Sequence, residues 1–190
     1  PNPLINDSSD APFSIIDALP TSPPVPALLG TLNVSAATGP ELTAVKGKSN
    51  QILGEFILEA ANEPAVISKI DFTFVFDTTS PISWSINDIT GFELYDEKGT
   101  IVAGPVDLDS ATGSYIKFSD AFVVPVGAHH YFLKARVSAT TILPDNTRII
   151  YLLFPPTYIS VVGQTSGYAI TASPEYKVSA SPVTLVSQTP

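Results

Sequence analysis

Few residues of this chain have the types and spacing that catalysis requires. His129 and His130 are the only histidines, and they are adjacent at the start of a predicted strand. Adjacent strand residues point to opposite faces, so the two imidazoles are not placed to chelate one metal ion together. The chain has no cysteine and no G-x-S-x-G sequence. A Ser-His-Asp arrangement is defined by geometry and stays open, but with no acid–base constellation in the sequence we expect no enzyme.

One loop offers oxygen ligands for a cation. Asp107 and Asp109 flank Leu108 in a polar loop that continues to Gly113. Alternate carboxylates in a loop are ligands that Ca²⁺ accepts, although the D-x-D-x-D-G run and its closing Glu are missing. Asp107 and Asp109 are therefore the calcium candidates, against the alternative of an ordinary solvated loop. No other cofactor is predicted.

Two kinds of carbohydrate chemistry are also represented. Trp84 is the only tryptophan and lies among hydroxyl residues. An exposed indole would stack on a sugar ring, whereas a buried one belongs to the core, which is our expectation. Asn6 and Asn33 each begin an N-x-S triplet, the acceptor pattern for N-glycosylation. The triplets matter only if the source glycosylates its exported proteins.

The composition excludes several classes of partner. Of 190 residues, 44% are hydrophobic and only 14% are charged, which suits one large β domain with hydroxyl-rich surfaces. The net charge of −9 makes nucleic acid and anionic membranes poor partners. No apolar run approaches the ~20 residues of a membrane helix. The chain starts at Pro1 and contains no Met, so we expect a processed product or a segment of a longer protein.

Residues 1–29 differ from the rest and form a predicted proline-rich N-terminal arm. Seven prolines fall within the first 26 residues, and no Gly, Lys or Arg precedes Gly30. Such a composition favours an extended, semi-rigid spacer. The arm contains one apolar island, Phe13–Leu19. The island either rests on its own domain or is donated to a neighbouring subunit by β-strand addition.

Residues 30–190 are predicted to form a β-sandwich domain. From Ile52 to Phe76 the sequence alternates between apolar and polar residues, with turn chemistry at Asn62-Glu63-Pro64. The side chains predicted to face inward are Ile52, Phe56, Leu58 and Ala60 before the turn and Val66, Ile70, Phe72, Phe74 and Phe76 after it. This pattern predicts a hairpin with one apolar face. Short strands separated by turn signals follow, with no convincing helix, and give about nine or ten strands in all. We therefore expect an all-β fold, an antiparallel immunoglobulin-like sandwich.

The order of sequence motifs along residues 30–187 resembles a repeat module of large prokaryotic cell-surface and extracellular filament proteins. The first motif spans residues 48–74, the second 89–99, the third 118–137 and the last 159–167. The resemblance implies an immunoglobulin-like module of a stalk, sheath or adhesive surface, and it implies no catalytic residues. The chain departs from the pattern because a proline-rich arm stands where a preceding repeat would be.

Together these features predict a non-enzymatic structural subunit or module of an extracellular surface assembly: a filament, sheath or stalk on a prokaryotic cell. Its expected partners are copies of itself or neighbouring repeats, joined through the arm. The assembly residues are the large apolar side chains of the island, Phe13, Ile15, Ile16 and Leu19. The alternative is a carbohydrate-binding or adhesin module in which Trp84 and tyrosines line the ligand face.

Overall fold

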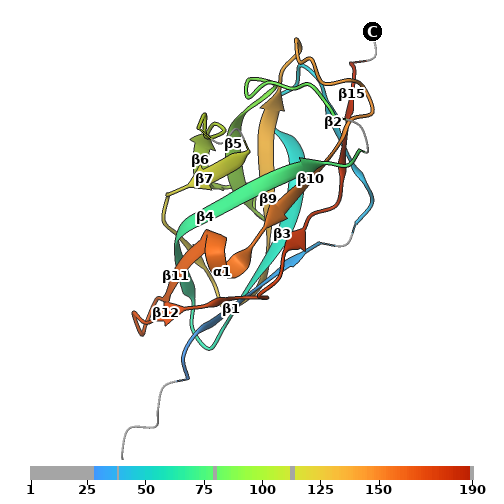
Figure 1. Cartoon of the computed structure of the whole chain (residues 1–190). Helices are drawn as coiled ribbons and strands as arrows, with labels where there is room; N and C mark the ends of the chain where they lie inside the picture. The colour runs from blue at the N-terminus through green and yellow to red at the C-terminus, as the bar shows by residue number, and fades with distance from the viewer. Residues whose placement is uncertain (1–27, 38, 79–80, 112–113, 189–190) are drawn as a thin grey trace, which may run out of the picture.

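Two β-sheets enclose one hydrophobic core in the computed structural model of this protein, which describes residues 28–37, 39–78, 81–111 and 114–188 (Figure 1). The strands are β1 (Thr31–Ala36), β2 (Leu42–Val45), β3 (Gln51–Ala61), β4 (Ala65–Phe76), β5 (Ile89–Asp96), β6 (Ile101–Val106), β7 (Tyr115–Phe118), β8 (Phe122–Val124), β9 (Gly127–Val137), β10 (Arg148–Leu153), β11 (Ile159–Gly163), β12 (Ala169–Ile170), β13 (Ala172–Ser173), β14 (Val178–Ser179) and β15 (Val183–Val186). One helical turn, α1, covers Pro155–Tyr158. An all-β fold is thus confirmed.

The first sheet has the order β13-β1-β3-β9-β5-β6, and the second the order β12-β11-β4-β10-β15-β2. In the second sheet β7 and β8 also pair with β4, and β14 pairs with β10. The expectation of purely antiparallel sheets is wrong, because β1 pairs with β13 and β2 with β15 in parallel. In both cases an early strand meets a late strand that has returned in the same direction, which needs a long crossover rather than a tight turn.

The predicted hairpin is wrong in its pairing. β3 and β4 follow each other, but β3 lies between β1 and β9 while β4 belongs to the other sheet. The turn at residues 62–64 carries the chain from one sheet to the other, so the buried faces of β3 and β4 meet across the core. The rings of Phe56 and Phe72 show this contact, with centroids 5.1 Å apart. Alternation identified two half-buried strands, but it carries no information about which strands pair.

Two irregularities also change which side chains face inward. The pairing of β3 with β9 shifts register between Ile52 and Gly54, and Leu53 is buried while Ile52, which was predicted to face inward, is exposed. In β4, Ile67 is fully buried, whereas Val66 is only half-buried. One extra residue in a strand moves every later side chain to the opposite face. The predicted inward positions of Ile52 and Val66 were therefore wrong.

The described chain begins and ends at opposite ends of the domain (Figure 1). The segment before β1 lies beside the turn between β3 and β4, where the Asn62 side chain donates to the Leu29 carbonyl at 2.9 Å. The segment that follows β15 lies beside the loop after β9, where the Ser187 hydroxyl donates to the Asp145 carboxylate at 2.7–2.8 Å. We call these the N-terminal end and the C-terminal end. Among the described residues no helix is long and apolar enough to cross a membrane.

Candidate functional site

Three distant segments meet at the N-terminal end around the carboxylate of Glu63. This side chain lies in the turn between β3 and β4, and the residue is only 7% exposed. Its Oε1 accepts hydrogen bonds from Gly30 N at 3.2 Å and Ser166 Oγ at 2.6 Å. Its Oε2 accepts from Thr165 N at 2.7 Å and Ser166 N at 2.8 Å. One carboxylate thus joins the segment before β1 to the turn and to the loop between β11 and β12.

The same hydrogen bonds decide what Glu63 can do chemically. The Ser166 side-chain hydroxyl foremost, together with the backbone N–H groups of Ser166, Thr165 and Gly30, holds the pKa of Glu63 below its usual value. A carboxylate with four donors stays ionised and has little remaining capacity to accept a proton from a substrate. The arrangement makes Glu63 an anchor for the chain rather than a general acid or base.

Two further residues shape this end. Asn62 adopts a left-handed backbone with φ of 69°, which Asn tolerates better than most residues and which directs its side chain to Leu29. Gly163 ends β11 directly against the Glu63 carboxylate, and a β-carbon at this position would overlap Glu63 Oε1 and the Ser166 hydroxyl. The absence of a side chain at Gly163 is therefore what admits the carboxylate.

A cavity of about 440 Å³ opens beside this anchor. Its rim carries two strongly exposed apolar side chains, Leu28 at 76% and Tyr168 at 66%. The cavity is lined by Leu28, Asn62, Glu63, Thr165, Ser166 and Tyr168. The first described residue of the chain thus lies on the rim of this cavity, at the point where the N-terminal arm joins the domain.

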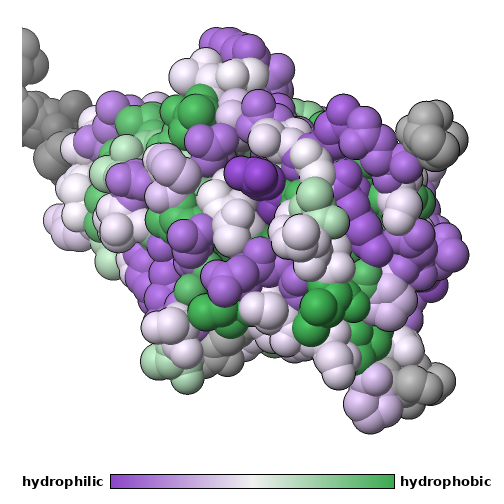
Figure 2. All heavy atoms as spheres, turned by 90° about the horizontal axis from the view of Figure 1, so that it is seen from above, coloured by the Kyte–Doolittle hydropathy of each residue, from purple (hydrophilic) through white to green (hydrophobic). Residues whose placement is uncertain are grey.

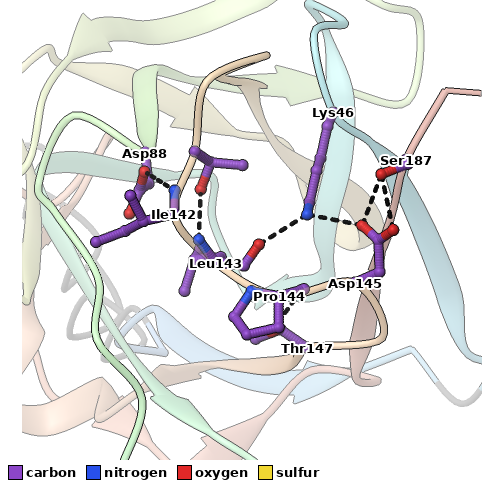
Figure 3. Close-up of polar contacts among 9 residues, drawn as sticks. Lys46, Asp88, Ile142, Leu143, Pro144, Asp145, Thr147 and Ser187 are labelled. Atoms are coloured by element: carbon purple, nitrogen blue, oxygen red, sulfur yellow. Dashed lines mark hydrogen bonds and ion pairs between the residues drawn. The ribbon is translucent and has the colours of Figure 1, made fainter.

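A second polar cluster holds the C-terminal end (Figure 3). The Lys46 ammonium donates to the Leu143 carbonyl at 2.7 Å and pairs with Asp145 Oδ1 at 2.7 Å. Ser187, which follows β15, donates to the same carboxylate at 2.7–2.8 Å. These contacts, Lys46 first and then Ser187, lower the pKa of Asp145. The end of the described chain is thereby tied to β2 and to the loop after β9.

Buried Asp88 binds the loop after β9. Its carboxylate accepts from Ser85 N at 2.6 Å and from Ile142 N at 3.1 Å, as Figure 3 shows for the second contact. Seen from the C-terminal end, apolar residues form separate small groups among hydrophilic ones (Figure 2). The C-terminal end therefore offers no broad apolar face in this view.

The calcium candidates each bind a donor from the protein. Asp107 Oδ1 accepts from Gly91 N at 2.7 Å, and Asp109 Oδ1 accepts from Ala111 N at 2.9 Å. The second Asp109 oxygen pairs with Lys117. Over the described ranges, no group of three or more His, Cys, Asp or Glu side chains is placed to hold a metal ion. Within these ranges no third carboxylate or imidazole joins Asp107 and Asp109.

The adjacent histidines bind different carboxylates. His129 Nδ1 lies 2.9 Å from Glu97 Oε1, and His130 Nδ1 lies 2.6 Å from Glu55 Oε1. Contact with His129 lowers the pKa of Glu97. The two imidazoles therefore belong to separate pairs, His130 with Glu55 of the adjacent strand β3 and His129 with Glu97 of the turn after β5, and neither joins the cluster around Glu63.

The carbohydrate candidates are placed as follows. Trp84 is half-buried and packs edge-on against Phe74 and Phe76, with ring centroids 5.3 and 5.8 Å apart. Asn33 is exposed on β1, and its side-chain oxygen accepts from the Ser173 hydroxyl at 3.3 Å. The remaining candidates, namely the acceptor Asn6 and the assembly residues Phe13, Ile15, Ile16 and Leu19, lie outside the described residues.

Sequence reasoning missed the residues that form the cavity. Glu63 was predicted only as part of a turn, and Tyr168 was not singled out. The partners of Glu63 are 33 and more than 100 residues away in sequence, so no local pattern announces the contact. The one usable signal was a carboxylate inside a turn between two strongly apolar strands, where burial demands donors.

No family model and no curated protein matches this chain. Among solved structures, one similar chain is AvmM, described as catalysing macrocyclization in alchivemycin A biosynthesis. It is 10% identical, with a TM-score of 0.36 over 85% of this chain and 90% of that chain. Another is a family 123 glycoside hydrolase from Clostridium perfringens, described for glycolipid glycan hydrolysis. It is 8% identical, with a TM-score of 0.35 over 83% of this chain and 28% of that chain. Similarities this low assign neither a fold family nor an activity.

Proposed function

We propose that this protein is a non-enzymatic structural subunit or module of an extracellular prokaryotic surface assembly, such as a filament, sheath or stalk. Neighbouring copies or repeats are joined through the N-terminal arm by strand addition. The observation that carries the proposal is the position of the chain ends. The chain enters at one end of the domain and leaves at the other, and both segments are held by buried or paired side chains.

This arrangement suits a module that is joined end to end with other modules. The Glu63 and Asn62 contacts fix the direction of the chain before β1, and Lys46 and Asp145 fix it after β15. Contacts that hold the segments before β1 and after β15 against the domain limit bending between neighbouring modules. The sequence motifs that resemble immunoglobulin-like repeat modules of prokaryotic surface proteins support the same function.

Electron microscopy of the full chain tests the proposal. We expect linear assemblies for the natural chain and single particles for a variant with Phe13→Asp and Ile16→Asp in the arm. Assemblies that are unchanged in the arm variant would show that the arm does not join the copies.

The alternative of a carbohydrate-binding or adhesin module rests on a different observation. Tyr168 and Tyr176 are exposed aromatic rings, and Tyr168 stands beside the amide and hydroxyl groups of Asn62 and Ser166. Exposed rings beside polar side chains suit a sugar ligand. Glycan-array binding that is lost on Tyr168→Ala would favour this alternative.

A further inference from the structure

The cavity at the N-terminal end suits an apolar ligand from another protein chain. Its volume of about 440 Å³ lies within the range of pockets that enclose small ligands or side chains, ~300–1,000 Å³. Leu28 and Tyr168 on the rim are strongly exposed, and Leu29, next to Leu28 in sequence, is exposed as well. A group of exposed apolar side chains around a cavity indicates an interaction site.

The floor of the cavity is ordered before any ligand arrives. The Glu63 carboxylate binds Thr165 and Ser166, and Gln164 N donates to the Pro64 carbonyl at 2.8 Å. The Tyr168 carbonyl accepts from Gly163 N at 2.9 Å, which fixes the backbone that presents the tyrosine ring. A site that is organised in advance loses less conformational freedom on binding.

A short sheet edge lies beside the cavity. β12 begins at Ala169, directly after Tyr168, and is the terminal strand of the second sheet in the described part of the chain. A terminal strand can accept one more strand through its backbone groups. Two other terminal strands, β2 and β6, offer less, because Val45 N in β2 is bonded to the Gln51 side chain and Gly104 N in β6 to Asp120.

The apolar island Phe13–Leu19 of the arm is a suitable ligand for this cavity. The proline-rich spacer after the island indicates which copy of the chain supplies it. Residues 20–27 separate the island from Leu28 and include four prolines. At ~3.1 Å per residue, an extended spacer of this length spans about 25 Å. A spacer that was extended to this length would separate the island from a cavity whose rim begins at Leu28, and we therefore take the cavity of a second copy as the target.

We propose that the cavity lined by Leu28 and Tyr168 receives the apolar island Phe13–Leu19 of a second copy, with the island backbone added to the edge of β12. The contact is heterologous, because an arm on one copy meets a cavity on the next, and it therefore continues into an open row. This inference rests on the proposed function and names the acceptor that the arm uses.

The acidic charge of the chain predicts how association depends on salt. The arm carries Asp7, Asp10 and Asp17 and no Lys or Arg, and the whole chain has a net charge of −9. Apolar contacts therefore have to overcome repulsion between acidic copies. Salt screens such repulsion, so we expect association to strengthen as the ionic strength rises.

A complementation experiment on the full chain tests the proposal. The arm variant carries Phe13→Asp and Ile16→Asp, and the cavity variant carries Leu28→Asp and Tyr168→Asp. All four positions are exposed or lie in the arm, and circular dichroism confirms folding. Sedimentation velocity is expected to show oligomers for the natural chain and monomers for each variant alone. A mixture of the two variants should form a 1:1 heterodimer, because the unsubstituted arm of the cavity variant binds the unsubstituted cavity of the arm variant. Tyr176→Asp, at a tyrosine 72% exposed that does not line the cavity, is the matched control and should assemble normally.

The remaining outcomes separate the two proposals. If the cavity variant assembles normally while the arm variant does not, the acceptor is wrong but the arm still joins the copies. If both variants assemble, or if the natural chain stays monomeric at high concentration and high salt, joining through the arm is wrong as well. A mixture that stays monomeric, although the natural chain assembles, would show that the arm does not insert into the cavity of another copy. Glycan binding lost in the cavity variant, with assembly intact, would assign the cavity to a sugar.

Discussion

The carboxylate of Glu63 lies directly against the α-carbon of Gly163, in the space that any side chain at position 163 would fill. The two residues are 100 positions apart and come from the turn between β3 and β4 and from the end of β11. Their contact closes the N-terminal end of the domain, because the carboxylate that fits over Gly163 also holds Gly30, Thr165 and Ser166.

Gly163→Ala is therefore expected to destabilise the domain more than a surface glycine substitution does. The new methyl group overlaps Glu63 Oε1, and moving the carboxylate away breaks its hydrogen bonds to Gly30, Thr165 and Ser166. Thermal unfolding should show a lower melting temperature than that of the natural chain. Gly39→Ala, where a β-carbon meets no atom within 4 Å, is the control and should leave it nearly unchanged.

Glu63→Gln should destabilise the domain at neutral pH and matter less in acid. Since the folded state lowers the pKa of Glu63 below 4.5, its contribution to stability is complete above that pH and is lost as the pH falls through the folded value. A glutamine amide also presents its own N–H groups to the donors of Thr165 and Ser166. Denaturant unfolding from pH 7 to pH 3 should show the gap between the two proteins narrowing. A gap that stays constant would contradict the ionised anchor, and Glu59→Gln on the exposed face of β3 serves as control.

Phe72→Ala should cost about 3–5 kcal/mol of unfolding free energy, the usual range for a buried phenylalanine. Phe72 is fully buried in β4 and its ring contacts both Phe56 and Phe118, with centroids 5.1 and 6.0 Å away. Urea unfolding measures the loss. Ile101→Ala, at an exposed position, should change stability by less than about 1 kcal/mol.

Trp84→Ala distinguishes core packing from sugar binding. The indole packs on Phe74 and Phe76, so we expect a loss of about 2 kcal/mol, less than for a fully buried ring. Its fluorescence should not change when oligosaccharides are added to the natural chain. A sugar-dependent change in emission, abolished by the substitution while stability is kept, would instead place a ligand on Trp84.

The sequence by itself determined the all-β character of this protein and most of its buried strand positions. A period of two in residues such as Phe56, Leu58, Phe72 and Phe74 follows from the geometry of any half-buried strand, whatever its neighbours. The composition likewise predicted the acidic, cysteine-free surface and the contrast between the arm and the domain. These are local or summed properties, and they do not depend on how the chain is arranged in space.

Tertiary structure alone decided which strands pair and where the candidate site lies. The turn at Asn62 and Glu63 is compatible with a hairpin or with a crossing between sheets. The crossing is selected because β1 and β9 pair with the edges of β3, and β10 and β11 pair with the edges of β4. The cavity beside Glu63 exists because residues near positions 30, 63 and 165 converge on one carboxylate. Such a contact depends on burial and on donors supplied from afar, and no pattern in a single stretch of sequence encodes it.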